Sequence, residues 1–160
     1  MVGNPQVIKS LQAALPLEAH LNIQYRTDQR VVKFMGVSKI AGKIKGFGDD
    51  AHLFQGKLQK QLMFLESVGT DSPINVNFTI MPIVTAPSIT ELLRHDLGLE
   101  VSSCTQYEDW AIQAWNNKDD ETRNLFEHLI KWKHDHVRWL EKQLRLIKGL
   151  GENEYIAENM

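Results

Sequence analysis

The chain has 160 residues, of which 42% are hydrophobic, and a formal net charge of -2, so we expect one domain with a substantial core. The charge gives no basic surface for nucleic acid, and no apolar run reaches the roughly 18 residues that a membrane-spanning helix needs. The single cysteine, Cys104, rules out an internal disulfide, and the N-terminus lacks a signal-peptide pattern, so the expected location is the cytoplasm.

The first two predicted elements are long helices over residues 5–32 and 38–66. Asn4 can cap the first helix, and Pro5 suits its first position, where a missing N–H group costs nothing. Pro16 lies inside this helix and predicts a kink, because proline removes a backbone hydrogen bond. Apolar residues in steps of three or four predict the inward face of each helix. These residues are Val7, Leu11, Ala14, Leu21, Tyr25 and Val32 in the first helix and Ile40, Ile44, Phe47, Ala51, Phe54, Leu58, Leu62 and Leu65 in the second.

Residues 67–87 predict a long connection rather than a helix. Glycine and prolines interrupt this stretch, and residues 75–84 have a strand-like pattern. Residues 116–118 make a much shorter turn further on, and residues 152–159 can form a short helix at the end of the chain. One long connection between short ones predicts an all-α, ferritin-like four-helix bundle. The long crossover joins its second and third helices, and a short fifth helix follows.

The third and fourth predicted helices have their own start and stop signals. Ser88-Ile89-Thr90-Glu91 has the pattern of a capping box, and Asp119 or Asp120 can cap the fourth helix. Gly149 and Gly151 are expected to end the fourth helix. The inward faces follow the helical spacing. They comprise Leu93, Leu97, Glu100, Cys104, Tyr107 and Ala111 in the third helix and Leu129, Lys133, His136, Leu140, Gln143 and Ile147 in the fourth.

Ionisable residues interrupt the inward faces of three helices, at Glu18, Glu100 and His136. A buried charge needs a partner, and a metal ion is one such partner. Di-iron helix bundles direct a Glu from each of two helices and a Glu-x-x-His pair from each of the other two toward their centre. Glu18 and Glu100 match the lone glutamates, and His136 matches one histidine. The sequence therefore predicts a site related to metal binding on these three residues.

Several segments of the chain resemble bacterioferritin. The matching segments are Leu17-Glu18-Ala19, Gln24-Tyr25, Phe64-Leu65-Glu66, Leu92-Leu93-Arg94-His95-Asp96-Leu97, Leu99-Glu100 and His136-Val137-Arg138-Trp139-Leu140-Glu141. The likeness covers nearly the whole chain except the central crossover, which is several residues longer here. It implies a single ferritin-like domain over residues 1–160 that assembles into an iron-storage cage.

The chain departs from this family at the residues that would hold two irons. Where the family has Glu-x-x-His, the second helix here has Ala51 and Phe54, and the fourth has Lys133 and His136. The two glutamates that bridge the irons in the family are therefore replaced, together with one histidine. We expect the ammonium of Lys133 to lie between Glu18 and Glu100 in place of the metal, because it can compensate both carboxylates. Phe54 can fill the vacated space.

These replacements favour a storage-shell subunit that lacks a complete ferroxidase centre. Its own ferroxidase activity should be absent or weak, and it would co-assemble with a site-competent subunit in a homo- or hetero-oligomeric cage. One alternative is a ferroxidase rebuilt with Asp50, and another is a single metal on Glu18, Glu100 and His136. A third is a shell or haem protein that is not used for iron storage. Lys133 discriminates between them, because a cation there opposes metal binding.

His52 is the second candidate for a functional residue. In bacterioferritin a methionine at this position binds haem b on a two-fold axis between subunits, and imidazole is also an ordinary haem ligand. Gly48 and Gly56 lie one turn to either side, leaving room for a flat macrocycle, and Arg26 could meet a propionate. A solvated or interface histidine is the alternative, because neighbouring positions are polar. The other four histidines, His20, His95, His128 and His134, are mostly expected at the surface.

Overall fold

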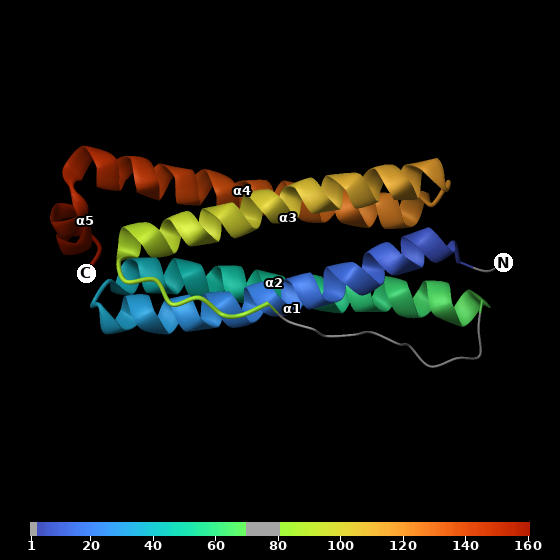
Figure 1. Cartoon of the computed structure of the whole chain (residues 1–160), viewed down its shortest axis with the longest axis horizontal. Helices are drawn as coiled ribbons and strands as arrows, with labels where there is room; N and C mark the ends of the chain where they lie inside the picture. The colour runs from blue at the N-terminus through green and yellow to red at the C-terminus, as the bar shows by residue number, and fades with distance from the viewer. Residues whose placement is uncertain (1–2, 70–80) are drawn as a thin grey trace.

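The computed structural model describes residues 3–69 and 81–160, and within them the chain forms helices and no strand. The helices are α1 (Pro5–Phe34), α2 (Ser38–Gly69), α3 (Ile89–Asn116), α4 (Asp120–Leu150) and α5 (Glu152–Glu158). α1 packs along α2 and α3 along α4 as two antiparallel pairs, and contacts of α1 with α3 and of α2 with α4 close the bundle (Figure 1). The predicted all-α, ferritin-like bundle with one long crossover and a short fifth helix is confirmed.

The ends of the helices follow local sequence signals, with one exception. The side chains of Asn4, Ser88 and Asp119 cap α1, α3 and α4 by accepting hydrogen bonds from backbone N–H groups. α4 passes through Gly149, so the prediction that this residue ends the helix is wrong. Gly151 ends it instead, with a φ of 85° that glycine adopts without strain. A glycine with helical φ lowers helix propensity by only about 1 kcal/mol, which the packing of a long helix outweighs.

The inward faces predicted from helical spacing are buried almost throughout, and only Leu97 is half-buried. α1 also continues through Pro16 to its end at Phe34. The buried side chains form two apolar clusters, one toward each end of the bundle. Between them the inward faces carry charged residues instead, and these residues form the candidate site.

α5 closes the end of the bundle at which α2 and α3 begin (Figure 1). Tyr155 is fully buried, and its hydroxyl donates to Oε1 of Gln143 on α4 at 2.9 Å. The carboxylate of Glu152 accepts hydrogen bonds from the backbone N–H and the hydroxyl of Thr90, at 3.1 and 2.8 Å. Glu152 therefore caps α3 from another helix, which fixes α5 against the bundle.

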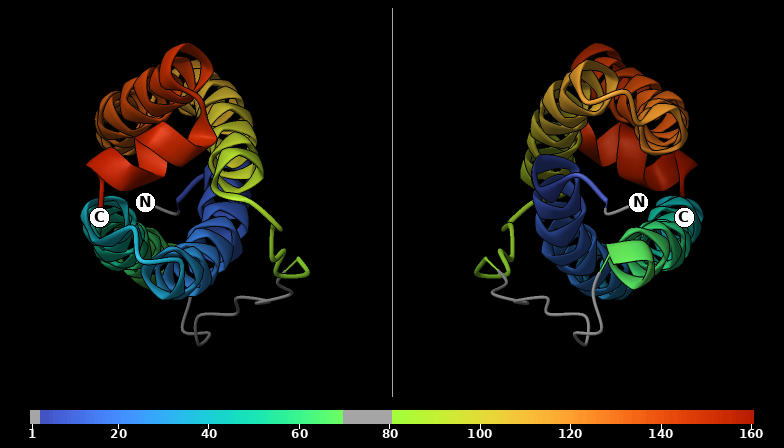
Figure 2. Two further views of the ribbon diagram at one scale, coloured as in Figure 1. Left: turned by 90° about the vertical axis from the view of Figure 1, so that its left-hand side faces the viewer. Right: turned by 90° about the vertical axis from the view of Figure 1, so that its right-hand side faces the viewer.

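The described end of the crossover, residues 81–88, has no regular secondary structure and lies along the outside of the bundle beside α1 and α3 (Figure 2). Gln24 on α1 holds it in place, because its Nε2 donates to the carbonyl of Val84 at 2.7 Å and its Oε1 accepts from the Val84 N–H at 3.0 Å. Of the strand-like residues 75–84, the first six lie outside the described residues. No helix in the described ranges is long and apolar enough to cross a membrane.

Candidate functional site

A layer of buried charges lies halfway along the bundle, between the two apolar clusters. α1 contributes Glu18, α3 contributes Glu100, and α4 contributes Lys133 and His136, each at most 4% exposed. These positions continue the helical spacing of the apolar residues, so their side chains face the bundle axis. The structure therefore brings together all three residues of the predicted metal-related site.

Lys133 occupies the centre of this layer. Its Nζ lies 2.8 Å from Oε1 of Glu18 and 3.8 Å from Oε2 of Glu100. The same nitrogen is 5.5 Å from the ring centroids of both Phe54 and Tyr107, within the range of cation–π attraction. Burial alone would lower the pKa of Lys133, but the two carboxylates outweigh burial and raise that pKa above its ordinary value. The predicted ammonium between two carboxylates is present and charged.

Tyrosine hydroxyls add hydrogen bonds to both glutamates. Tyr107 donates to Oε1 of Glu18 at 2.8 Å, and Tyr25 donates to Oε1 of Glu100. Burial raises the pKa of Glu18, because the cost of desolvation exceeds the attraction of Lys133. Burial acts in the same direction on Glu100, but Lys133 and the neighbouring hydrogen bonds outweigh it and hold the pKa of Glu100 below its ordinary value. An ionised Glu100 therefore faces the ammonium.

His136 connects the layer to the surface of the bundle. Its Nδ1 lies 3.2 Å from Oε1 of Glu100, and its Nε2 lies 2.7 Å from Oδ2 of Asp50 on α2. Burial would lower the pKa of His136, but the hydrogen bonds to Asp50 and Glu100 raise it above its ordinary value. The ring of Phe47 stacks on the imidazole, with centroids 4.0 Å apart. A doubly protonated ring donates from both nitrogens, which leaves neither lone pair available to a metal.

A pair of iron ions does not fit this layer. Within the described residues, no group of three or more His, Cys, Asp and Glu side chains is arranged to hold a metal ion. Lys133 occupies the space beside Glu18, and the fully buried ring of Phe54 lies next to it. Ala51, also buried, supplies no ligand atom. Two irons would have to displace a bonded ammonium and would still lack their bridging carboxylates.

Comparison with known proteins identifies the family of this fold. The family model of the ferritin-like domain matches residues 8–150. The chain belongs to the ferritin-like family. Among curated ferritin-like relatives, the bacterial ferritin of Synechocystis is 27% identical over 161 aligned residues, covering 100% of this chain and 99% of the relative. The bacterioferritin of Brucella melitensis is 27% identical over 155 residues, covering 97% of this chain and 92% of the relative.

A solved ferritin-like structure shows the same fold over the full chain. The bacterioferritin of Rhodobacter capsulatus superposes with a TM-score of 0.91 at 28% identity, over 99% of this chain and 96% of that one. That structure has a metal-free dinuclear site and a haem iron in a crystallographic special position. The resemblance to bacterioferritin seen in the sequence is therefore confirmed.

His52 lies on an exposed face of α2. Two contacts set the register of α1 against α2 on this face, a hydrogen bond of 3.3 Å from Asn22 to Gln55 and an ion pair of 2.8 Å between Arg26 and Asp49. This register places His52 opposite residues 23–25 of α1. A Cβ at Gly56 would meet no atom within 4 Å, whereas a Cβ at Gly48 would come within 3.3 Å of the Arg26 guanidinium. Gly48 therefore makes room for Arg26, and only Gly56 leaves open space beside His52.

Sequence analysis missed a second group of buried ionisable residues. Asp28 on α1 and Asp96 on α3 are 2% and 0% exposed. His20 is also buried, at 3%, and is an exception to the expectation that most of these histidines lie at the surface. A signal was available, because Asp28 lies three residues after the inward Tyr25 and Asp96 lies four before Glu100. These spacings put both aspartates next to the inward faces.

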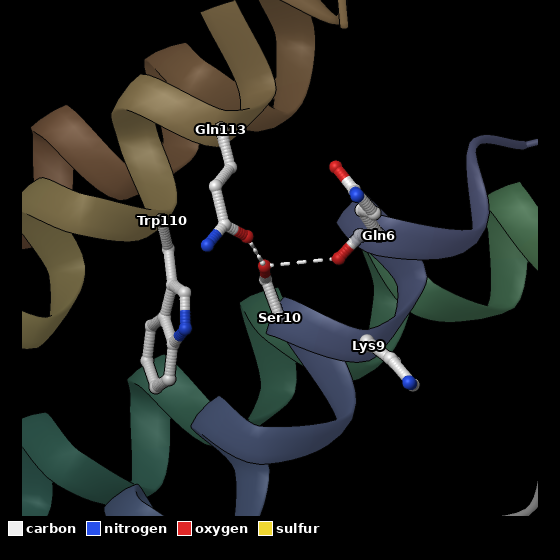
Figure 3. A pocket seen from close by; sticks show the side chains of 5 residues that line it. All are labelled: Gln6, Lys9, Ser10, Trp110 and Gln113. Carbon is white, nitrogen blue, oxygen red and sulfur yellow. Dashed lines mark hydrogen bonds between the residues drawn. The ribbon is translucent and has the colours of Figure 1, made fainter. Parts of the chain in front are cut away.

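A surface hollow of about 400 Å³ lies between the first turns of α1 and the last turns of α3 (Figure 3). The Oγ of Ser10 lies 3.0 Å from the carbonyl oxygen of Gln6 and 2.9 Å from Oε1 of Gln113. Trp110 forms one wall of the hollow. Ser10 in this hollow is about two helical turns from Glu18. The hollow is therefore separate from the charged layer.

Proposed function

We propose that the chain is a shell subunit of an iron-storage cage in the cytoplasm and does not oxidise iron itself. The observation that carries this proposal is the ammonium of Lys133, 2.8 Å from Glu18 in a layer where di-iron bundles hold their metals. Iron ions at such a site are held by several carboxylate oxygens, and here a fixed cation uses them instead. Oxidation would then depend on a second, site-competent subunit in the same cage.

Exposed apolar side chains on α1 and α3 support assembly into a cage. Ile112 and Trp115 on α3 are each 58% exposed, and Phe34 at the end of α1 is 94% exposed. Large exposed apolar side chains are typical of surfaces that contact other subunits. The close superposition on Rhodobacter capsulatus bacterioferritin also supports an assembly, because it covers nearly all of both chains.

We expect the purified full-length chain to form a large closed assembly rather than a monomer. Small-angle X-ray scattering at micromolar protein concentration measures its size and shows whether it is hollow. Native mass spectrometry of the untagged protein from its own host then identifies any second subunit type. A compact monomer in solution would contradict the cage, whereas a cage made of this chain alone would contradict only the co-assembly.

We further propose that His52 binds haem b at a two-fold contact with the same histidine of a second copy. The exposed imidazole, the open space at Gly56 and the opposing turn of α1 support this assignment. Arg26 is 32% exposed and bonded to Asp49, so it can turn to a haem carboxylate without leaving a buried partner. Haem at this position would supply a redox-active iron for electron transfer through the shell.

We expect His52→Ala to lose bound haem and, with it, the low-spin absorption bands of a bis-imidazole complex. The measurement is the absorption spectrum of the reconstituted assembly, with haem content from a pyridine extract. His134→Ala, which changes an exposed histidine on α4, is the matched control and should retain full haem content. Unchanged haem content in the His52 variant would show that the ligand lies elsewhere.

The rebuilt ferroxidase has one contact in its favour, the 2.7 Å approach of Asp50 to His136. The same contact argues against the rebuilt ferroxidase, because His136 donates to Asp50 and cannot offer that nitrogen to a metal at the same time. A single metal on Glu18, Glu100 and His136 meets the same obstacle and must also displace Lys133. The storage subunit without its own centre is therefore the function that the geometry supports best.

A further inference from the structure

Asp28 and Asp96 form a buried carboxyl pair that lies apart from the charged layer. They come from α1 and α3, and their side chains are close enough to hydrogen bond to each other. Both oxygens of Asp96 and Oδ2 of Asp28 are buried, and no donor within the described part of the chain hydrogen bonds to them. Two ionised carboxylates in contact at a buried site repel each other. A proton or a metal cation between them would remove this repulsion.

A proton fits between these carboxyl groups better than a metal ion does. A metal would need at least a third ligand, and the described residues provide no such group. One shared proton converts the contact into a charge-assisted hydrogen bond between a carboxylic acid and a carboxylate. Burial raises the pKa of Asp28 to about 9 and that of Asp96 to about 7, which is the behaviour of a pair that retains a proton at neutral pH.

The carboxyl pair is connected to the crossover through Gln24. The amide nitrogen of Gln24 donates to Oδ1 of Asp28 at 2.9 Å and to the carbonyl of Val84 at 2.7 Å. With both amide hydrogens used, the Oε1 of Gln24 is oriented to accept the Val84 N–H at 3.0 Å. Asp28 therefore fixes the side chain that pairs with the backbone of Val84.

We infer that Asp28 and Asp96 share one proton and act as a pH-sensitive latch, which fastens crossover residues 81–84 to the outside of α1. When the proton leaves, the two carboxylates repel each other and Asp28 moves from Asp96. Gln24 then loses its fixed orientation, and Val84 loses both of its hydrogen bonds to this side chain. The inference does not depend on the proposed storage function.

The other groups near the pair modulate the latch without replacing it. On α3, Nδ1 of His95 lies 3.8 Å from Oδ1 of Asp96, and the charge of Glu100 one turn away raises the pKa of Asp96 further. On α1, Tyr25 faces Asp96 as well. The crossover residues 81–86 contribute no ionisable side chain.

The direction of the pH effect follows from proton binding. The folded pair holds its proton up to the pKa of about 9 for Asp28, whereas an unfolded aspartate releases it near its ordinary pKa of roughly 4. The folded chain therefore binds more protons throughout this range, and stability falls as the pH rises. The contribution of the latch to the free energy of unfolding is fully present below a pH of roughly 4. It is lost as the pH rises through about 9.

Hydrogen–deuterium exchange of the intact assembly tests the latch. Peptides covering residues 81–88 are followed by mass spectrometry from pH 6 to pH 10, with rates corrected for the intrinsic pH dependence of exchange. We expect wild-type protection of Val84 to fall by about tenfold or more across the alkaline part of this range. Asp28→Asn should keep its protection at every pH, because its amide donates permanently to Asp96. Asp109→Asn, an exposed change on α3, should behave like the wild type.

Infrared spectroscopy of the wild-type assembly tests the shared proton without any variant. A protonated carboxylic acid has a C=O stretch that a carboxylate lacks, and this band should be present at pH 7 and disappear on alkaline titration. Asp96→Asn provides a second isosteric variant if Asp28→Asn does not fold. Absence of the acid band, or pH-independent protection in the wild type, would overturn the inference. Stoichiometric Zn²⁺ binding that Asp28→Asn abolishes would instead assign the pair to a metal.

Discussion

Added Fe(II) is expected to be oxidised by the purified homo-oligomer hardly faster than by buffer. The carboxylates that would bridge two irons are absent at Ala51 and Lys133, and Phe54 fills the space of a missing histidine. The remaining carboxylates, Glu18 and Glu100, already compensate the charge of Lys133. Stopped-flow absorbance in the near ultraviolet, recorded under oxygen, measures the reaction.

A gain-of-function variant tests whether the missing ligands explain the absence of rapid iron oxidation. Ala51→Glu, Phe54→His and Lys133→Glu together restore a Glu-x-x-His pair on both α2 and α4. We expect this triple variant to acquire a rapid phase that saturates near two irons per subunit, which is about the stoichiometry of a di-iron bundle. Lys133→Glu alone is the control and should lack the phase, because α2 still offers no ligand. A rapid saturating phase in the wild type would favour the rebuilt site that uses Asp50.

Removing the central ammonium should cost a large part of the stability. Lys133→Ala leaves Glu18 and Glu100 buried without their cation, and breaking a buried pair in this way costs about 3–5 kcal/mol. Chemical denaturation at a fixed protomer concentration measures the loss in the free energy of unfolding. Lys131→Ala, an exposed change two residues away, should cost less than about 0.5 kcal/mol.

A compensated variant separates lost charge from lost volume. Lys133→Met keeps most of the side-chain volume but leaves the two carboxylates uncompensated, so it should remain clearly destabilised. Adding Glu18→Gln removes one of those charges and should recover part of the stability, because a buried pair can be replaced by neutral groups at little cost. If Lys133→Ala leaves the free energy of unfolding almost unchanged, the ammonium does not lie in a closed, dry layer and the geometry of the site is wrong.

The sequence predicted the charged layer because helical spacing applies to polar residues as well as apolar ones. Glu18, Glu100, Lys133 and His136 continue the inward faces, and all four are buried where the spacing places them. Comparison with the Glu-x-x-His pattern of di-iron bundles then predicted which ligands are missing and that the ammonium of Lys133 lies between the two glutamates, and the structure has that ammonium there.

Features that depend on contacts between distant segments could not be predicted in this way. Asp28 is buried because it meets Asp96 from another helix and because Gln24 beside it is covered by residues 81–84. No periodicity in the sequence indicates the path of an irregular crossover. Arg26 likewise covers Gly48 through a contact between two helices, so the open space expected at that glycine is filled.

Lys133 differs from a bound metal ion in being covalently attached to α4. An iron ion dissociates when iron is scarce or a chelator is present, and an empty di-iron site is left with mutually repelling carboxylates. A tethered ammonium at 2.8 Å from Glu18 has no such dissociation equilibrium. On the proposed function, folding of this chain would therefore not depend on iron supply, and a cage could assemble before any iron arrives to fill it.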